Sequence, residues 1–205
     1  MSINFNVLRK NPLLFVISGP TAVGKDSVIH ALHERQLPLH FVVTANTRPP
    51  RPDELEGVDY FFVSHEKFEE MIHNQELIEY SHVYNDYKGV PRSQVEDAFK
   101  SGKDVIMRLD VQGAEKIRKI YPEAVLIFMV PGSEEEWMER LNIRSKERTI
   151  DLSMRIEKAR QEMDKLPIFD YVVVNHQDHL QEAVNTVVAI MTAEHSRVHP
   201  RKLIP

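Results

Sequence analysis

A glycine-rich segment that ends in a lysine is the first pattern in this sequence that could do chemistry. Gly19-Pro-Thr-Ala-Val-Gly24-Lys25 has the spacing G-x-x-x-x-G-K, follows a short apolar run and leads into a helical pattern. In such a loop the backbone N–H groups surround a phosphate, and the start of the helix adds partial positive charge. We therefore expect a phosphate site at nine consecutive residues: Gly19, Pro20, Thr21, Ala22, Val23, Gly24, Lys25, Asp26 and Ser27.

The residue after this lysine departs from the usual pattern. A serine or threonine normally stands there, and its hydroxyl holds Mg²⁺. Here the residue is Asp26, and Ser27 follows it. A carboxylate beside phosphates is repelled unless a cation or an arginine lies between them. Asp26 is therefore expected to contact Mg²⁺, to contact an arginine or to turn away.

Two arginines three residues apart form a second candidate anion site. Arg48 and Arg51 follow a predicted strand, and paired guanidinium groups suit bidentate recognition of a phosphate. The backbone around them is stiffened by Pro49, Pro50 and Pro52. Solvation at the surface is the alternative interpretation of this pair.

The composition is that of an ordinary folded domain, and it excludes several kinds of site. The chain has 205 residues, of which 42% are hydrophobic and 28% charged, and its net charge of −5 argues against a general nucleic-acid binder. The absence of cysteine excludes a disulfide scaffold, Cys-ligated zinc, an iron–sulfur cluster and a thiol nucleophile. No apolar run reaches the roughly 20 residues of a membrane helix, so no membrane partner is expected.

Short apolar runs alternate with longer amphipathic runs, which is typical of an α/β layer fold. The apolar runs, several of them rich in Val, Ile, Leu and Phe, predict strands at 13–18, 41–44, 60–63, 104–110, 125–130 and 171–175. The amphipathic runs predict helices at 25–35, 66–74, 93–101, 112–120, 134–143, 150–165 and 179–196. Ser133 and Glu136 predict a capping box, and Gly102 stands where a helix C-cap glycine belongs.

Two stretches break this alternation. Residues 41–94 combine short strand-like pieces, one helix and many polar residues, whereas residues 145–153 are very polar and lie between two predicted helices. We interpret the first stretch as a substrate-binding insert and the second as the tip of a mobile lid. Ordinary surface excursions are the alternative for both stretches.

Four further motifs, taken with the phosphate loop and the arginine pair, point to a family. They are Gly57-Val-Asp-Tyr60-Phe-Phe-Val63, Glu76-Leu-Ile-Glu79-Tyr80, Tyr84-Asn-Asp-Tyr87-Lys88-Gly89 and Leu109-Asp110-Val-Gln-Gly113. With them the chain resembles the guanylate kinases, which phosphorylate GMP from ATP, over nearly its whole length.

The resemblance implies an α/β fold of the P-loop nucleoside monophosphate kinase type. Its parallel five-stranded core sheet is flanked by helices and carries a GMP-binding insert and a helical lid. On this interpretation residues 1–205 form a single domain, with the core at 12–43, 96–132 and 166–197. The insert would cover about 44–95 and the lid about 133–165.

The resemblance assigns one group of residues to the phosphate of GMP. Arg48 and Arg51 would grip this phosphate, and the hydroxyl of Tyr60 would join them. Lys88 stands where many members have a phosphate-binding tyrosine, and an ammonium group can serve the same phosphate. The alternative for Tyr60 is an ordinary strand aromatic.

A second group is assigned to the guanine base. Glu79 and Asp110 would accept hydrogen bonds from the ring N–H and the exocyclic amine, because ionised carboxylates only accept. Adenine presents a different donor pattern, so this pair would discriminate against AMP; structural ion pairs are the alternative. Thr44 matches a hydroxyl position of the guanine pocket. Val90 stands where a serine often contacts guanine O6, so recognition there must come from elsewhere or be weaker.

A third group is assigned to ATP and to the transfer step. The catalytic residues would be Lys25, Arg48, Arg144 and Arg155. Arg140 and Asn175 would join the phosphate loop in binding ATP, and Mg²⁺ would accompany ATP as the cofactor. Salt bridges along the helices are the alternative for the three lid arginines.

A further departure links two of these sites. Arg108 replaces a carboxylate that is common near the metal in the family, whereas Asp26 adds a carboxylate to the phosphate loop. We hypothesise that the two side chains approach each other, with Asp26 holding Mg²⁺ through water and Arg108 offsetting its charge or touching a phosphate. The Gly-Lys-Asp sequence and Asp86-Tyr87-Lys88-Gly89 also resemble the plant organellar branch of the family.

The expected partners are therefore ATP and GMP, with dGMP as a second acceptor, and no nucleic acid or membrane. The chain is expected to be a monomer or a homodimer in the cytoplasm, or in a plastid or mitochondrial matrix if a transit segment was removed. Two other functions stay open: a peptide-binding module without catalysis, and a kinase that acts on a phosphorylated sugar.

The remaining candidates are expected to be structural. The histidine pairs at 30/33 and 176/179 lack a third ligand at convincing spacing. Trp137 is expected to pack against the core, and the polar tail at 195–205 is expected to fray.

Overall fold

The computed structural model describes residues 11–83, 85–145 and 152–202, apart from the side chains of Arg144 and Ser145. Its centre is a five-stranded sheet in the order β2-β7-β1-β8-β9, in which every neighbouring pair is parallel. The strands are β1 (Leu14–Ser18), β2 (Leu39–Phe41), β7 (Asp104–Arg108), β8 (Val125–Pro131) and β9 (Tyr171–Asn175). The predicted parallel five-stranded core is confirmed.

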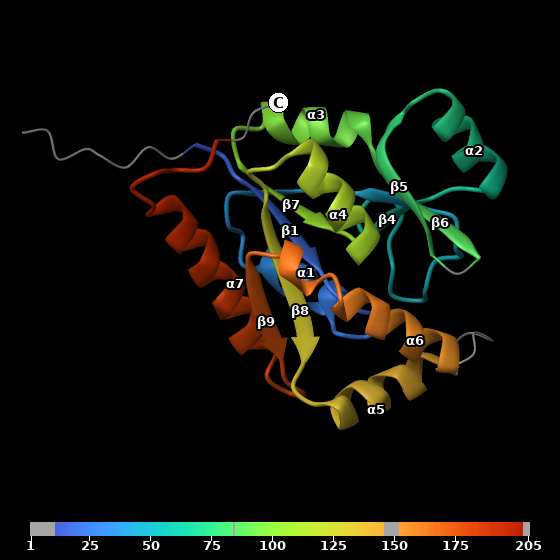
Figure 1. Cartoon of the computed structure of the whole chain (residues 1–205). Helices are drawn as coiled ribbons and strands as arrows, with labels where there is room; N and C mark the ends of the chain where they lie inside the picture. The colour runs from blue at the N-terminus through green and yellow to red at the C-terminus, as the bar shows by residue number, and fades with distance from the viewer. Residues whose placement is uncertain (1–10, 84, 146–151, 203–205) are drawn as a thin grey trace, which may run out of the picture.

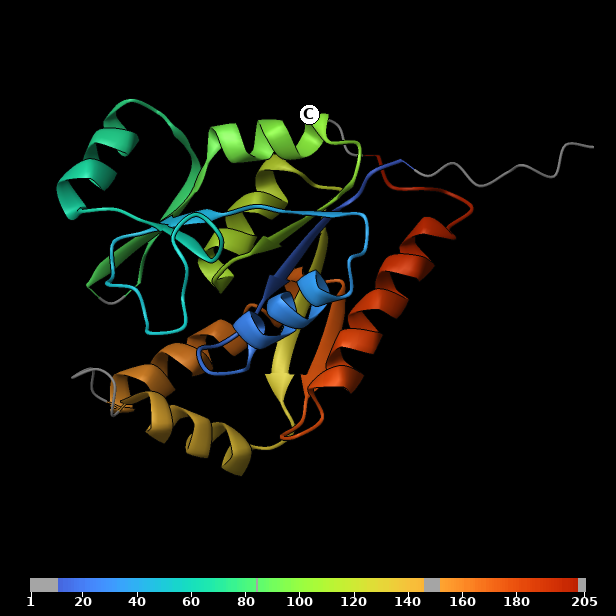
Figure 2. The same cartoon turned by 180° about the vertical axis from the view of Figure 1, so that it is seen from behind.

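Helices cover both faces of this sheet, as Figures 1 and 2 show. The helices α1 (Lys25–Glu34) and α7 (Leu180–His195) lie on one face, and α3 (Arg92–Lys100) and α4 (Val111–Ile120) lie on the other. All the predicted helices are present, and each end lies within two residues of its predicted position. Gly102 has φ +66° just beyond α3, as its predicted C-cap position requires.

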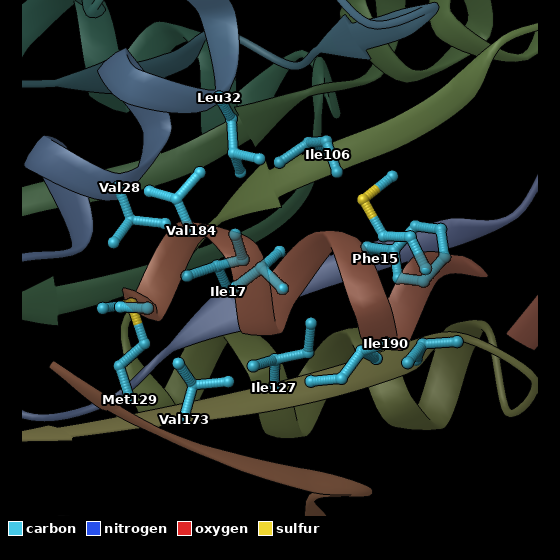
Figure 3. Packing of buried hydrophobic residues seen from close by; sticks show 14 of the residues in the cluster. Phe15, Ile17, Val28, Leu32, Ile106, Ile127, Met129, Val173, Val184 and Ile190 are labelled. Carbon is cyan, nitrogen blue, oxygen red and sulfur yellow. The ribbon is translucent and has the colours of Figure 1, made fainter. Parts of the chain in front are cut away.

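The side chains of β1 explain this layering, because successive residues of a strand point to opposite faces. Phe15 and Ile17 pack with Val28 of α1 and other residues of the first helical layer (Figure 3). Leu14 and Val16 pack in a separate cluster with residues of α3 and α4. Since β1 is buried throughout, the phosphate loop that follows it begins from a fixed point.

A second sheet lies beside the core, within the region predicted as the insert (Figure 1). Its order is β4-β3-β6-β5, with β3 (Thr44–Asn46), β4 (Tyr60–Phe62), β5 (Leu77–Val83) and β6 (Asp86–Pro91). Ala45 and Leu77 pack on the helix α2 (His65–His73) through Phe68 and Met71. The hydroxyl of Ser64 caps α2 by accepting from Lys67 N. One face of this sheet is thereby covered.

Two strand predictions in this region are wrong. The predicted strand at 41–44 is replaced by two short ones, because β2 ends at Phe41 and β3 begins at Thr44. The antiparallel hairpin of β5 and β6 was not predicted as strands at all. Its second strand contains Gly89 and Pro91, which weaken any strand pattern in a sequence.

Two helices, α5 (Glu134–Ser145) and α6 (Leu152–Met163), form a pair beyond the end of β8, within the region predicted as the lid (Figure 1). A 3₁₀ turn (Leu166–Ile168) then returns the chain to β9. The hydroxyl of Ser133 accepts from Glu136 N at 3.2 Å, as predicted, but the Glu136 carboxylate accepts from Gly132 N instead of completing the box. Most of the predicted lid tip, residues 146–151, lies outside the described residues.

The C-terminal tail contacts the core as far as Arg201, so the expectation that it frays is wrong for this part. Arg201 Nε donates to Glu194 Oε2 at 2.9 Å, and Arg201 Nη2 donates to Asp170 Oδ1 at 3.2 Å. Glu194 is only 1% exposed and also accepts from the Tyr171 hydroxyl at 2.6 Å. Within the part of the chain that is described, no helix combines the length and apolar character needed to span a membrane.

Candidate active site

The backbone of the phosphate loop requires both of its glycines. Gly19 has φ +136°, and a Cβ there would lie 2.3 Å from Met129 O. Gly24 has φ +89°, and a Cβ there would lie 2.2 Å from Asn175 Nδ2. Only glycine tolerates both the positive φ and the close approach. The loop therefore follows one fixed path into α1, whose N-cap residue is Gly24.

Lys25 spans the loop from the first position of α1. Its Nζ donates to Gly19 O at 2.6 Å and to Pro20 O at 2.8 Å. The loop is also joined to helix α5, since Trp137 Nε1 donates to Thr21 O at 2.9 Å. The prediction that Trp137 packs against the core is confirmed, because its ring also contacts the first core cluster.

One cavity brings most of the predicted site residues together. It is lined by the phosphate loop, the second sheet, the end of β7 and helix α6. The predicted residues in its lining are Gly19, Thr21, Lys25, Asp26, Thr44, Arg48, Arg51, Tyr60, Glu79, Lys88, Asp110 and Arg155. The arginine pair and Lys25 thus share one cavity, although they come from different parts of the fold.

A glutamate orients the arginine pair. Arg48 is 4% exposed, and both of its terminal nitrogens donate to the Glu54 carboxylate. The backbone N–H of Arg51 donates to Glu54 Oε2 at 2.8 Å, and its Nη1 lies 3.3 Å from Glu54 Oε1. Burial raises the pKa of Glu54, but the hydrogen bonds from Arg48 and from the Arg51 backbone, together with the charges of both arginines, outweigh burial, so the pKa lies below its ordinary value. Sequence reasoning missed Glu54, although its spacing from Arg51 in a proline-stiffened turn was a usable signal.

The predicted approach of Asp26 and Arg108 is confirmed. Arg108 Nη1 donates to Asp26 Oδ1 at 2.9 Å, and Asp26 Oδ2 lies 3.5 Å from Arg51 Nη1. Arg108 also donates from Nη2 to Asp59 O at 2.5 Å, where Asp59 precedes β4. Asp26 therefore contacts one arginine at the end of β7 and another in the loop between β3 and β4, which is one of the three outcomes expected for a carboxylate in this loop.

Three cationic side chains surround the ring of Tyr60. The distances to the ring centroid are 4.2 Å from Arg108 Cζ, 5.0 Å from Arg48 Cζ and 5.5 Å from Lys88 Nζ. The ring face is electron-rich and stabilises nearby cations. Burial lowers the pKa of Lys88 to about 8. This concentration of positive charge around a phenol hydroxyl suits an anion with several oxygens.

The two predicted guanine carboxylates lie in the same cavity but have different surroundings. Asp110 accepts from Gly113 N at 2.7 Å as the N-cap of α4, and from the Ser81 hydroxyl at 2.7 Å. Burial, reinforced by the charge of Asp110, raises the pKa of Glu79 to about 8. Glu79 is thus mostly protonated at pH 7. Gly113 permits this arrangement, since a Cβ there would lie 3.1 Å from Glu79 Oε1.

The two positions expected to differ from the family pattern, Lys88 and Val90, both lie on β6 of the second sheet. Lys88 lies on β6 and lines the cavity, as expected for a phosphate ligand. Val90 is 0% exposed and belongs to the second core cluster. Thr44 is buried opposite Tyr60 in the sheet register and lines the cavity. Ser81, which sequence reasoning missed, supplies a hydroxyl group on the neighbouring strand β5.

Helix α6 contributes one face to the cavity. Arg155, Lys158 and Glu162 all line it, and their spacing of three and four residues puts them on the same side of a helix. Burial raises the pKa of Glu162 to about 7, and the charges of Lys25 and Lys158 moderate that rise. Only Arg155 was singled out from the sequence. The helical spacing from Arg155 was the signal that could have found the other two.

A sequence model of the guanylate kinase family matches residues 11–194. The chain belongs to the guanylate kinase family. It is 46% identical over 191 residues to "Guanylate kinase 2, chloroplastic/mitochondrial" of Oryza sativa subsp. japonica, covering 93% of this chain and 67% of the relative. It is 40% identical to the guanylate kinase of Shouchella clausii, covering 92% and 91%. The crystal structure of guanylate kinase from Anaplasma phagocytophilum has a TM-score of 0.74 at 30% identity, covering 94% and 90%.

As a guanylate kinase, the protein is an enzyme that transfers a phosphoryl group from ATP to GMP. Several residues predicted to bind ATP lie in or beside its phosphate loop without lining the described cavity: Pro20, Ala22, Val23, Gly24, Ser27, Arg140 and Asn175.

Two of these residues brace the loop of this guanylate kinase. Asn175 is buried, and its Nδ2 donates to Val23 O at 2.9 Å. Arg140 donates to Asn175 O at 3.0 Å and lies 3.6 Å from Glu136, a salt bridge along α5 of the kind given above as its alternative role. The side chain of Arg144 lies outside the described part of the structure.

Proposed function

We propose that this enzyme transfers the γ-phosphoryl group of ATP to GMP, and also to dGMP, with Mg²⁺ in the described cavity. The observation that supports the proposal is that Lys25, the pair Arg48 and Arg51, and the carboxylates Glu79 and Asp110 all line one cavity. Phosphoryl transfer needs positioning of two phosphates and neutralisation of the moving charge more than it needs covalent chemistry.

The acceptor phosphate would bind among the cations around Tyr60. Arg48 and Arg51 are held by Glu54, so their guanidinium groups need little reorganisation when the anion arrives. Lys88 would add a point charge, and the Tyr60 hydroxyl would donate a hydrogen bond. Bidentate contacts from the arginines would fix the direction of the attacking oxygen.

The guanine base would bind at Glu79 and Asp110, with the hydroxyl of Thr44 beside them. Asp110 is held by two donors, and its remaining lone pairs would accept from the base. Glu79 would lose its proton when the ring N–H arrives, because a carboxylate is the stronger acceptor. AMP would be discriminated against, since it lacks these donors.

The donor nucleotide would bind at the phosphate loop. Backbone N–H groups from Gly19 to Gly24 and the side chain of Lys25 would surround its phosphates, and Ser27 would stand at the edge of this site. Arg144 and Arg155 of the lid would close over the transferred group, while Arg140 and Asn175 would support the adenosine side. Closure would exclude water and so suppress hydrolysis of ATP.

The residues of this cavity fit a Mg²⁺ ion that is held mainly by the phosphates of the substrate. Within the described ranges no three His, Asp or Glu side chains gather as a metal site. Mg²⁺ is usually held by one or two carboxylates together with waters and substrate phosphates. The side chain of Asp26 is 28% exposed and lines the cavity, so it can hold the ion through water. The ion would add positive charge beside the transferred phosphoryl group.

The cellular location and the oligomeric state of the enzyme are also proposals. We expect a cytoplasmic monomer or homodimer that acts on small nucleotides. The chloroplastic/mitochondrial name of the rice relative keeps a plastid or mitochondrial matrix as the alternative. Localisation by a fluorescent fusion and sedimentation of the purified protein would decide these two points.

A coupled assay for ADP tests the proposed reaction. GMP, dGMP, AMP and a ribose bisphosphate are each supplied with ATP and Mg²⁺, and turnover is expected with the two guanine nucleotides. Lys25→Met is expected to abolish turnover, whereas Lys67→Met on the surface of α2 is the matched control. Excess EDTA is expected to stop the reaction. Turnover only with the sugar phosphate, or with no acceptor at all, would contradict the proposal.

A further inference from the structure

Asn46 is a buried polar residue to which the proposed roles assign nothing. It ends β3, is 0% exposed and lines the cavity. Its Oδ1 accepts from the backbone N–H of Arg48 at 3.2 Å. Because a backbone N–H can pair only with an acceptor, this contact fixes which end of the amide is nitrogen. Asn46 Nδ2 then has no hydrogen-bond partner among the described residues.

The sheet register shows what surrounds this donor. Asn46 lies opposite Phe62 of β4 and opposite Lys88 of β6, and residues directly opposite each other share one face of a sheet. Arg48 Cζ lies 5.6 Å from the centroid of the Phe62 ring. The row that contains Glu79 is a different one, since Glu79 lies opposite Val90. The Asn46 amide therefore lies on the face of the second sheet that lines the cavity, among the cations Arg48 and Lys88 that are proposed to bind the acceptor phosphate.

We propose that Asn46 is a further substrate-binding residue, whose Nδ2 donates a hydrogen bond to a phosphate oxygen of the nucleoside monophosphate. This inference rests on the proposed binding of that phosphate by Arg48 and Lys88. A phosphate group offers more acceptor sites than those side chains fill. A neutral amide adds direction without adding to the repulsion between the cations. It also satisfies a donor that would otherwise stay buried and unpaired, which is costly.

The substitution Asn46→Ser separates the two contacts of the amide. A serine hydroxyl can still accept from a backbone N–H two residues on, so the Arg48 backbone stays held. Its side chain is too short to donate at the position of Nδ2. We expect the KM for GMP to rise about tenfold, while the KM for ATP changes less than twofold. Asn74→Ser, at the exposed end of α2, is the matched control and should leave both constants unchanged.

Inhibition by guanosine, which has no phosphate, locates the contact. An unchanged inhibition constant for guanosine in Asn46→Ser, together with the raised KM for GMP, supports the inference. An equal loss of guanosine and GMP affinity overturns it, because the amide would then serve the base. A KM for GMP within twofold of wild type also overturns it.

Two further measurements keep these outcomes distinct. If Asn46→Ser melts well below wild type, Asn46→Thr restores the lost volume, and the same KM comparison is made on it. If the wild-type enzyme does not phosphorylate GMP, the proposed function fails. Calorimetric binding of GMP to wild type and variant then tests the contact by itself, and equal affinities overturn it.

Discussion

Arg108 and Asp26 form an ion pair, Nη1 to Oδ1 at 2.9 Å, that joins the end of β7 to the first turn of α1. Arg51, between β3 and β4, lies 3.5 Å from the same carboxylate, so three parts of the chain meet at one group. The carboxylate of Asp26 and the guanidinium of Arg108 thus offset each other's charge. The pair therefore predicts that neither side chain can be replaced alone without loss.

A double-mutant cycle checks this coupling. Asp26→Ser and Arg108→Asp should each lower kcat/KM at least tenfold, because each leaves a charge beside the cavity without its partner. The free-energy loss of the double variant, calculated from kcat/KM, should be smaller than the sum of the two single losses by about 1 kcal/mol or more. Additivity within about 0.5 kcal/mol would contradict the pairing. The exposed pair of Lys67 and Glu70 is the control cycle, and its coupling should stay below about 0.5 kcal/mol.

The pH dependence of kcat/KM for GMP follows from Glu79 and Lys88, whose pKa values burial moves to about 8 from opposite sides. Below pH 8 the Glu79 carboxyl is protonated and must lose its proton to accept from guanine, so kcat/KM should rise with pH. Above pH 8 Lys88 loses its charge, so kcat/KM should fall. A maximum near pH 8 is expected, since this profile reports the free enzyme.

Two variants test which residue causes the acid limb and which causes the alkaline limb of this pH profile. Glu79→Gln should remove most of the acid limb, and dividing the wild-type profile by that of the variant cancels the titration of GMP itself. Lys88→Arg should flatten the alkaline limb, because a guanidinium stays charged throughout this range. An alkaline limb that persists unchanged in Lys88→Arg would rule out Lys88 as its origin.

Ser81 positions the carboxylate of Asp110, the proposed acceptor for guanine. Its hydroxyl donates to Asp110 Oδ2 at 2.7 Å, while Gly113 N holds the other oxygen. Ser81→Ala should raise the KM for GMP about three- to tenfold, the usual worth of one hydrogen bond, and leave the KM for ATP unchanged. Ser81→Thr keeps the hydroxyl and should restore the wild-type value. Equal changes in both KM values would indicate a general structural effect instead.

Arg201 should stabilise the folded enzyme without affecting catalysis. Arg201→Ala removes one ion pair with the buried Glu194 and one with the partly exposed Asp170, which should cost about 1–3 kcal/mol and lower Tm by several degrees. The side chain of Arg197 also contacts Glu194 but is 46% exposed, so Arg197→Ala should cost at most about 0.5 kcal/mol. Calorimetric melting compares the two. Equal Tm values for both variants would show that the tail is not an anchor.

The core and the phosphate loop could be predicted from the sequence because their signals are local. The glycine spacing around Lys25 and the continuous apolar run of β1 need no information from distant residues. The same holds for the helices, whose periodicity gave their ends within two residues. The Asp26–Arg108 contact was predictable for a different reason, since a carboxylate in a phosphate loop demands a nearby cation.

The missed features depend on pairing between distant segments. Leu77–Val83 becomes a strand through its antiparallel pairing with Asp86–Pro91, which offsets the weak strand propensity of the latter. Glu54 meets Arg48 only through the turn between β3 and β4, and Ser81 meets Asp110 only because the second sheet lies beside the core. Composition and spacing do not report such contacts. The tail was misjudged likewise, since Arg201 finds its carboxylate partners only in the folded chain.

Trp137 is the only tryptophan of the chain, and its indole N–H is bonded to Thr21 O in the phosphate loop. The intrinsic emission of the enzyme above the tyrosine range therefore comes from one fluorophore near the start of α5. Any step that shifts the loop relative to α5 changes the polarity around this indole. The fluorescence of Trp137 could therefore be used to measure the rate of nucleotide binding by stopped flow, without an attached dye.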